Sequence, residues 1–265
     1  MSNITFVYPT NTRAVSLTGT NCAMNCPWCG GHYLKKMAEL TQIEQSVAKP
    51  ASLLISGGWN AQGQLPWEEN FNRLLSLKNQ GIRLNIHSGL WKKEQVSRLK
   101  ELNPVISFDF LLDQGLMKEC GFVFSTTEVM QSYDLLVDSG LPVIPHLLLG
   151  RNRGSLSGDF EILKTLSAYN PKKLVLLIFI PTPDTTFADC PVPELLDLEK
   201  FFSRAQETMG RTSLILGCMR PGGALRVKID NLAVKHNFSK IVMPAPQIRK
   251  TATKTLQQNE CCAFD

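Results

Sequence analysis

Three cysteines lie close together near the start of the chain. Cys22, Cys26 and Cys29 fall within "TNCAMNCPWCGGHYL", in a C-x3-C-x2-C spacing. Three chemistries use such thiols. A structural zinc site normally takes four ligands in two spaced pairs, and a disulfide framework needs partner cysteines in an oxidising compartment. An iron–sulfur cluster can use three thiolates and leave one iron open to a ligand that is not protein. The rest of the sequence distinguishes these three.

The composition indicates a globular protein of a reducing compartment. The chain has 265 residues, of which 43% are hydrophobic and eight are cysteines. Its start has no basic region followed by an apolar stretch, so no signal peptide is predicted, and its most apolar segment, 173–181, is too short to cross a bilayer. We therefore expect a cytoplasmic protein whose cysteines serve metal or redox chemistry. The net charge of +5 comes without a dense run of Lys or Arg, so neither a nucleic acid nor a membrane is expected as a partner.

Short apolar runs alternate with helical patterns along the chain. Helical spacing occurs between the runs, for example at 68–81, 94–103 and 129–140. Eight such strands predict an α/β fold, a full or partial (β/α)8 TIM-type barrel, although an open doubly wound sheet fits the same alternation. We expect one domain over 1–265, with a polar cysteine-containing tail at 247–265 that has no strand signal and caps the rim. The predicted strands are 13–20, 51–58, 82–89, 105–112, 141–150, 173–181, 212–219 and 239–246.

Unusual residues gather where the predicted strands end. "TGTNC", "SGGW", "NIHSG", "FDFLLD" and "GCMRPGG" all stand at such ends. The carboxyl ends of the strands build the active site in α/β barrels. Because the cysteine loop directly follows the first predicted strand, it is expected on that same rim.

The cysteine loop resembles the signature of the radical S-adenosylmethionine (radical SAM) superfamily, with Trp28 directly before the last cysteine. The resemblance implies that Cys22, Cys26 and Cys29 bind a [4Fe-4S] cluster and that SAM chelates the open iron. It also implies that one electron cleaves SAM to a 5′-deoxyadenosyl radical, which removes a hydrogen atom from the substrate. Trp28 is expected to pack against a flat ligand or to shield the cluster from water.

A second segment resembles the glycine-rich turn that lies beside the SAM amino group in this superfamily. It consists of Ser56, Gly57 and Gly58, at the end of the second predicted strand. Glycine lets backbone carbonyls, which are acceptors for an ammonium group, come close to a ligand. Trp59 stands where the family often has an acidic residue, so recognition of the amine would fall to the backbone.

Polar side chains inside otherwise apolar strands supply further candidates. Asn85, His87 and Asp109 must find partners if they are buried. We expect them to face SAM or substrate, and a structural hydrogen bond in the barrel floor is the alternative for each. His146 and Gly150 resemble the position at which family members contact adenine.

The remaining cysteines suggest a second metal centre. Cys218 stands at a predicted strand end, and Cys261 and Cys262 lie in the polar tail, where exposed free thiols are a liability. We predict that these three hold an auxiliary iron–sulfur cluster. Cys190 could be a ligand or a bystander, and Cys120 is expected to be buried and inert.

Over nearly its whole length the chain resembles the biotin synthase-related branch of the superfamily. Biotin synthesis itself is not expected, because the inner strands carry polar residues and histidines where biotin synthase places cysteines. "GCMRPGG" and the terminal "CC" are closer to small homologues that form one component of two-component lipoyl synthases. That resemblance implies sulfur insertion into an octanoyl chain carried on a protein or peptide, a second radical SAM subunit, and an electron donor such as ferredoxin or flavodoxin. The alternatives are a radical SAM methylation or rearrangement in cofactor synthesis, and a metal-binding scaffold without enzymatic activity.

Overall fold

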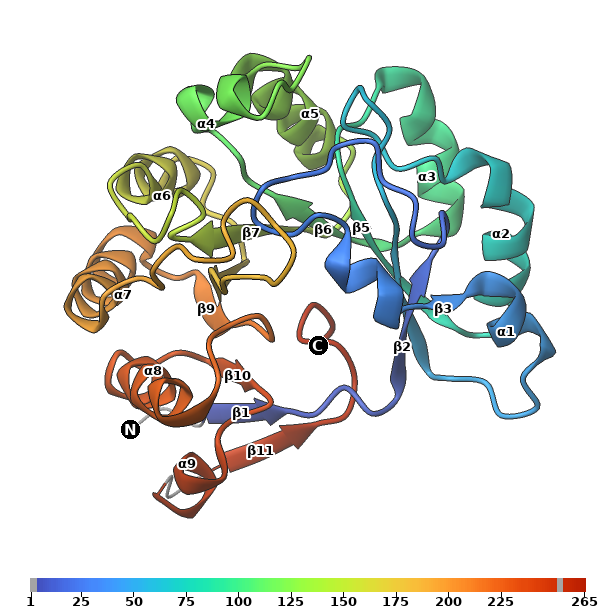
Figure 1. The fold of residues 1–265 in the computed structure, drawn as a ribbon. Coiled ribbons are helices and arrows are strands. Elements are labelled where there is room, and N and C mark those ends of the chain that lie inside the picture. The colour runs from blue at the N-terminus through green and yellow to red at the C-terminus, as the bar shows by residue number, and fades with distance from the viewer. Residues whose placement is uncertain (1–3, 252–254) are drawn as a thin grey trace. The chain divides into compact units, whose positions relative to one another are not determined.

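The computed structural model describes residues 4–251 and 255–265, and the chain divides into two compact units (Figure 1). The N-terminal unit is Thr10–Val143 together with Phe264, and the C-terminal unit is Met1–Pro9 and Ile144–Ala263 together with Asp265. Both units are built from parallel strands that alternate with helices. The fold is a partial TIM-type (β/α) barrel, as the sequence predicts. That the chain acts as a single domain stays a prediction.

The N-terminal unit has the strand order β6-β5-β4-β2-β3. Two of its helices begin at the caps that the sequence provides. Asp113 accepts a hydrogen bond from the backbone of Leu116 at the start of α4, and Ser125 forms a capping box with Glu128 at the start of α5. The elements are β2 (Thr12–Ser16), η1 (His32–Lys36), β3 (Ala38–Glu39), α1 (Leu40–Gln45), β4 (Ser52–Ser56), η2 (Glu68–Asn70), α2 (Phe71–Asn79), β5 (Arg83–Ser88), η3 (Lys93–Gln95), α3 (Val96–Leu102), β6 (Val105–Asp109), α4 (Gln114–Glu119) and α5 (Thr126–Asp138).

The strands of this unit have one apolar face and one face with polar residues. The register pairs Ile55 with Ile86 and Ile86 with Ile106, and all three side chains are fully buried. Burying each such side chain contributes about 1.5–3 kcal/mol. Because side chains alternate along a strand, Asn85, His87 and Ser107 belong to the opposite face. Helices α2 and α3 lie along one side of these strands (Figure 1).

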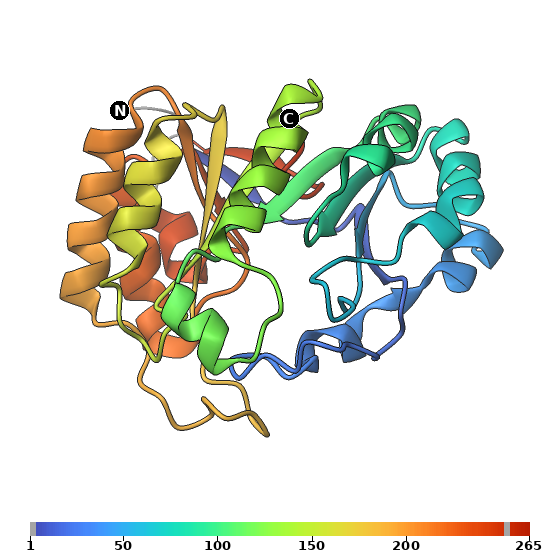
Figure 2. The same ribbon diagram turned by 90° about the horizontal axis from the view of Figure 1, so that it is seen from above.

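The C-terminal unit has the strand order β11-β1-β10-β9-β8-β7. Helix α7 packs against both α6 and α8, and the three helices lie on one side of the strands (Figure 2). No helix within residues 4–251 and 255–265 is long and apolar enough to span a bilayer. The elements are β1 (Ile4–Val7), β7 (Val143–Leu149, in this unit from Ile144), α6 (Asp159–Ser167), β8 (Lys173–Ile178), α7 (Leu195–Met209), β9 (Ser213–Leu216), α8 (Gly223–Lys235), β10 (Lys240–Val242), α9 (Pro246–Thr251) and β11 (Thr255–Gln258).

Each of the eight predicted strand segments overlaps a strand, and the three predicted helical segments overlap α2, α3 and α5. Strand β2 and helix α5 begin earlier than predicted, at Thr12 and Thr126. The tail was expected to contain no strand, and that part of the prediction was wrong. Residues 255–258 form β11, which runs parallel to β1 and pairs Ile4 with Thr255 and Val7 with Gln258. The sequence "TLQQ" gave no strand signal because β11 is an edge strand whose side chains are mostly exposed. The backbone of β11 pairs with β1, so β11 joins the sheet without an apolar face of its own.

Candidate functional site

The cysteine loop follows β2 in the N-terminal unit. Cys22, Cys26 and Cys29 form no disulfide bond within the described residues, and all three residues are partly exposed. The backbone N–H groups of Cys29 and Gly30 both donate to the Cys26 carbonyl, at 3.0 and 2.8 Å, which closes a tight turn between the last two cysteines. Gly30 and Gly31 adopt the left-handed conformation, with φ of 48° and 70°, which glycine reaches without steric cost. The sequence therefore folds locally into a loop that carries three partly exposed cysteines.

The glycine turn after β4 packs directly against this loop. A Cβ atom at Gly58 would lie 1.9 Å from the Asn21 carbonyl oxygen and 2.5 Å from the Cys22 Cα, so no other residue fits without moving the backbone. The Gly58 N–H donates to Thr18 Oγ1 at 2.6 Å. The turn thus fixes the position of Cys22, a role that sequence analysis did not assign to it.

The residues flanking Gly58 are tied to the same loop. The Ser56 carbonyl accepts a hydrogen bond from the Leu17 N–H, and the Trp59 carbonyl accepts one from the Ala23 N–H, both at 2.9 Å. Gly57 has φ of 157°, where side chains are strained. A carbonyl oxygen has two lone pairs, so the carbonyls of Ser56 and Trp59 can each accept a further hydrogen bond from a ligand.

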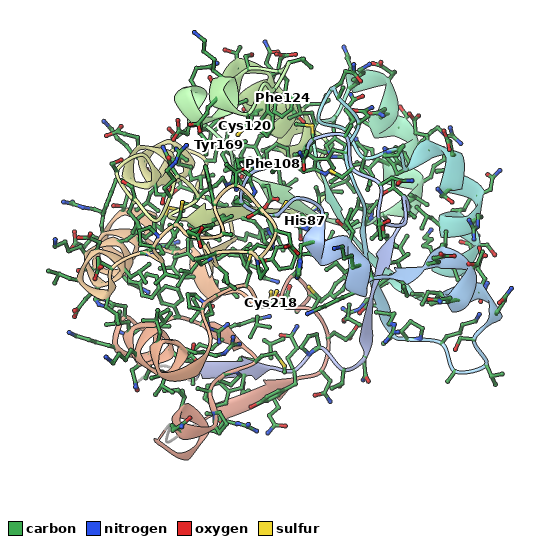
Figure 3. The ribbon with its side chains drawn as sticks, viewed as in Figure 1. His87, Phe108, Cys120, Phe124, Tyr169 and Cys218 are labelled. Atoms are coloured by element: carbon green, nitrogen blue, oxygen red, sulfur yellow. The ribbon has the colours of Figure 1, made fainter. Side chains whose placement is uncertain are left out.

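Trp28 is largely buried, with 8% of its surface exposed. Its ring meets Phe122 edge to face at 6.2 Å, and Phe122 stacks on Phe124 at 5.3 Å. Phe124, labelled in Figure 3, packs so closely on Gly63 that a Cβ there would lie 2.5 Å from its ring. This aromatic packing favours shielding of the cysteine loop over stacking on a flat ligand as the role of Trp28.

The polar face of β5 and β6 carries one hydrogen-bonded pair and one close histidine–carboxylate pair. Asn85 has no exposed surface, and its Oδ1 accepts from Ser107 Oγ at 2.9 Å. His87, labelled in Figure 3, has Nε2 at 3.1 Å from Asp109 Oδ2, and about a quarter of each of these side chains is exposed. Asn85 thus makes the structural hydrogen bond that the sequence left open, whereas the His87–Asp109 pair is accessible to a ligand. Cofactor binding by these three residues stays a prediction.

His146 and Gly150 belong to the C-terminal unit. His146 is buried in β7, and its Nδ1 lies 3.0 Å from the Ile144 carbonyl oxygen. Gly150 has φ of 71° and donates its N–H to Asp159 Oδ2 at 2.7 Å. A Cβ at Gly150 would lie 2.3 Å from Pro193 Cγ, so close packing already accounts for a glycine at this position. Contact with adenine stays a prediction for both residues.

A second group of thiols lies in the C-terminal unit. Cys218 follows β9 (Figure 3), and Cys261 and Cys262 follow β11; together they form the three-thiol group. The side chains of Cys262 and Cys261 are hydrogen-bonded, and this bond, followed by burial and the charges of Cys261 and Cys218, raises the pKa of Cys262 well above its usual value. Although the Cys218 residue reaches solvent, the protein around its thiol raises the pKa of Cys218, and the charge of Cys261 adds to the shift. The three thiols are therefore near enough to affect one another, and a metal that binds Cys218 and Cys262 has to displace their protons.

Neither thiol group converges on a single point. Within residues 4–251 and 255–265, no three or more His, Cys, Asp or Glu side chains are arranged to hold one metal ion. A structural zinc ion requires such an arrangement. A cluster does not, because each thiolate binds a different iron. Iron–sulfur clusters at the two thiol groups therefore stay a prediction.

A buried ion pair that sequence analysis missed supports the three-thiol group. Arg220 and Asp230 have no exposed side-chain surface, and Arg220 Nε lies 2.7 Å from Asp230 Oδ1. The guanidinium also donates to the carbonyls of Gly217, at 2.5 Å, and Met243, at 3.3 Å. Asp230 Oδ2 accepts the N–H of Ala245 at 2.7 Å. The pair thus joins α8 to the segments after β9 and β10, beside Cys218.

The sequence held one signal for this ion pair. Asp230 lies on the buried stripe of α8 with Ile229 and Ala233, and a charged residue on such a stripe normally has a charged partner. The identity of that partner could not be read from the sequence.

The other two cysteines are less informative. Cys120 ends α4 (Figure 3) and is partly exposed, so the expectation that it is buried was wrong. Helix α4 is short and its last turn lies near the surface. Cys190 is also partly exposed, and its N–H donates to the Phe187 carbonyl at 3.2 Å, which leaves its role open.

No protein-family model and no curated protein matches the chain. Solved structures do match it. HydG, described as a maturase of the [FeFe]-hydrogenase, is similar with a TM-score of 0.66 and 14% identity, over 91% of this chain and 57% of its own. Methylornithine synthase (PylB) is similar with a TM-score of 0.63 and 12% identity, over 92% of this chain and 73% of its own. The structure of anSMEcpe with bound AdoMet and Cp18Cys peptide has a TM-score of 0.52 and 12% identity, over 89% and 63%.

This chain therefore spans less than two thirds of HydG and of anSMEcpe. At identities this low, the likeness shows a shared fold.

Proposed function

We propose that the chain is a radical SAM enzyme that binds a [4Fe-4S] cluster through Cys22, Cys26 and Cys29. The observation that carries the proposal is a loop with three partly exposed cysteines, none of them in a disulfide within the described residues, that packs directly on the glycine turn at Gly58. The fold is shared with anSMEcpe, whose structure holds AdoMet, the same molecule that the motif implies here.

Cys22, Cys26 and Cys29 fit a [4Fe-4S] cluster in the type and number of their donor atoms and in their partial exposure. When bound, the cluster supplies the electron that cleaves SAM to a 5′-deoxyadenosyl radical for hydrogen abstraction from the substrate. Three thiolates leave one iron open for SAM. Gly57 and Gly58 keep side chains away from the turn and allow a ligand amine to approach the backbone. Trp28, packed on Phe122, shields one side of the loop from water.

Reductive cleavage of SAM tests the proposal. The chain is reconstituted anaerobically with iron and sulfide, reduced with dithionite and supplied with SAM. We expect 5′-deoxyadenosine from the wild type and none from the Cys22→Ala, Cys26→Ala, Cys29→Ala variant. Cys120→Ala removes another partly exposed thiol of the same unit and should leave the yield unchanged. Continued formation of 5′-deoxyadenosine by the triple variant would refute the assignment.

We further propose that the reaction is sulfur insertion into an octanoyl chain, in lipoyl cofactor synthesis. The sulfur has to come from a sulfide near the substrate radical, and the first cluster cannot give up its own sulfide without losing the SAM site. The three-thiol group supports a second, auxiliary cluster as the source. Arg220 supports its fit, because its charge opposes the rise in the pKa of Cys218 and so favours the thiolate that binds iron.

The resemblance in the sequence supports the proposed partners. These are a second radical SAM subunit, an octanoylated protein or peptide as substrate, and ferredoxin or flavodoxin as electron donor. A cytoplasmic location would keep the eight cysteines reduced.

Iron content and product analysis test sulfur insertion. We expect the reconstituted wild type to carry roughly eight irons per chain, four for each cubane. The Cys218→Ala, Cys261→Ala, Cys262→Ala variant should keep about four irons and SAM cleavage but form no sulfur-containing product from an octanoylated peptide. About four irons in both proteins would remove the auxiliary cluster and favour methylation or rearrangement instead.

A further inference from the structure

A half-buried lysine holds one side of the turn that carries Cys261 and Cys262. Lys240, at the start of β10, donates from Nζ to Gln258 Oε1 at 2.8 Å. The same Gln258 side chain donates from Nε2 to the Cys261 carbonyl at 2.7 Å. Gln258 is itself fixed, because its carbonyl accepts the Tyr8 N–H at 2.8 Å. The backbone of Cys261 is therefore connected through Gln258 to Lys240.

A second lysine holds the other side of the turn. Lys173, at the start of β8, donates from Nζ to the carbonyl of Ala263, the residue after Cys262, at 3.0 Å. The same ammonium lies 2.5 Å from Asp265 Oδ1. Only 14% of the Lys173 side chain is exposed, so this contact is not a loose surface pair. Both cysteines thus lie between two lysine contacts.

The two lysines are close enough to affect each other. Burial lowers the pKa of Lys240, and the charge of Lys173 lowers it further, whereas negative charge on Asp265, Cys262 and Cys261 acts in the opposite direction. Two neighbouring ammonium groups repel each other, and nearby anions offset this repulsion. Thiolates bound to a metal at the three-thiol group would be such anions.

We propose that Lys173 and Lys240 are positioning residues of a metal centre at the three-thiol group. They fix the backbone on both sides of Cys261 and Cys262 and place positive charge beside the thiolates. The proposal rests on the second centre of the proposed function, and it concerns residues that no motif marks. A merely structural role would lower the free energy of unfolding without changing the metal affinity of the folded chain.

Reconstitution of the full-length chain with iron and sulfide tests the proposal. The Cys22→Ala, Cys26→Ala, Cys29→Ala background leaves the three-thiol group as the cysteine cluster, and the visible absorption band of a thiolate-bound cluster reports its occupancy. We expect Lys173→Met and Lys240→Met each to weaken the affinity for iron about tenfold, measured by competition with a chelator, and the double variant to weaken it more. Lys240→Arg, which keeps the charge, should recover part of the affinity. Lys172→Met, at an exposed neighbouring position, should have no effect.

The outcomes separate this inference from sulfur donation. Unchanged iron affinity in the double lysine variant would overturn it and leave the auxiliary cluster standing, and the absence of a cluster band in the parent chain would overturn both. Adding Cys218→Ala, Cys261→Ala and Cys262→Ala should abolish the band, and a band that survives would also count against the proposal. Lysine-dependent iron binding in a chain that forms no sulfur-containing product would uphold the lysine role and refute sulfur donation.

Discussion

The two thiol groups of this chain are assembled in different ways. Cys22, Cys26 and Cys29 lie on one loop, which is fixed by backbone hydrogen bonds and by contact with Gly58. Cys218 and the Cys261–Cys262 pair come from separate segments, which are held by buried or half-buried charged side chains. The position of the first group therefore depends on close backbone packing at Gly58, and the position of the second depends on hydrogen bonds and ion pairs made by charged side chains. Substitutions should affect the two groups separately.

The largest expected effect concerns the buried ion pair behind Cys218. Arg220→Met leaves the Asp230 carboxylate buried without its partner, and breaking such a pair costs about 3–5 kcal/mol of unfolding free energy. Urea denaturation followed by circular dichroism measures this loss. The Arg220→Met, Asp230→Leu variant removes both charges and should recover part of the stability.

The same variants test whether the two thiol groups are independent of each other. In the fraction that remains folded, Arg220→Met should weaken metal binding at the three-thiol group and spare SAM cleavage by the cysteine loop. Loss of SAM cleavage in the folded fraction would show that the two groups are not independent.

The next largest effect is expected at the glycine turn. Gly58→Val places a side chain against the backbone of Asn21 and Cys22, so the cysteine loop has to move. A displacement of about 1 Å can cost roughly a hundredfold in rate, and we expect SAM cleavage to fall by at least that factor. The yield of 5′-deoxyadenosine measures it, while iron binding at the three-thiol group should persist.

Gly115→Ala is the matched control in the same unit. A Cβ there would have Asp113 Oδ1 at 3.4 Å as its nearest neighbour, and the substitution should leave cleavage unchanged. Wild-type cleavage by Gly58→Val would mean that the loop does not need its contact with the turn.

Features that depend on one short segment of the chain could be predicted from the sequence. The cysteine loop could be recognised because its three thiols share one short segment, and buried parallel strands such as β8 could be recognised because they are almost continuously apolar. The polar edge strand β11 could not, because its partner β1 lies at the other end of the chain. The pairing of Arg220 with Asp230, and of Lys240 with Gln258, depends on tertiary contacts that no local pattern specifies.

A moderate effect is expected at the accessible His87–Asp109 pair. If the pair faces SAM, as the sequence predicts, Asp109→Asn removes a charged hydrogen-bonding partner worth about 1.5–3 kcal/mol. We therefore expect SAM affinity to fall about tenfold, measured by calorimetry on the reconstituted enzyme.

Ser107→Ala provides the control for this pair. It removes the partner of the fully buried Asn85 on the same face, and should cost about 1–3 kcal/mol of stability without changing SAM affinity. Unchanged SAM affinity in Asp109→Asn, together with lower stability, would give the His87–Asp109 pair a structural role as well.

The smallest expected effect is a pH dependence confined to the tail. The hydrogen bond from Lys173 lowers the pKa of Asp265 below 3.8, so the pair stabilises the docked tail fully above pH 3.8 and is lost as the pH falls through the lowered value. Because the Asp265 side chain is 92% exposed, water screens the pair and the effect is small. Hydrogen exchange of residues 255–265 should be slightly faster in Asp265→Asn than in the metal-free wild type near neutral pH. That difference should vanish as Asp265 becomes protonated in the wild type, and residues 20–31 should show none at any pH, because this segment contains no Asp, Glu, Lys or Arg. An equal change in both segments would mean that Asp265 acts on the whole fold and not on the tail.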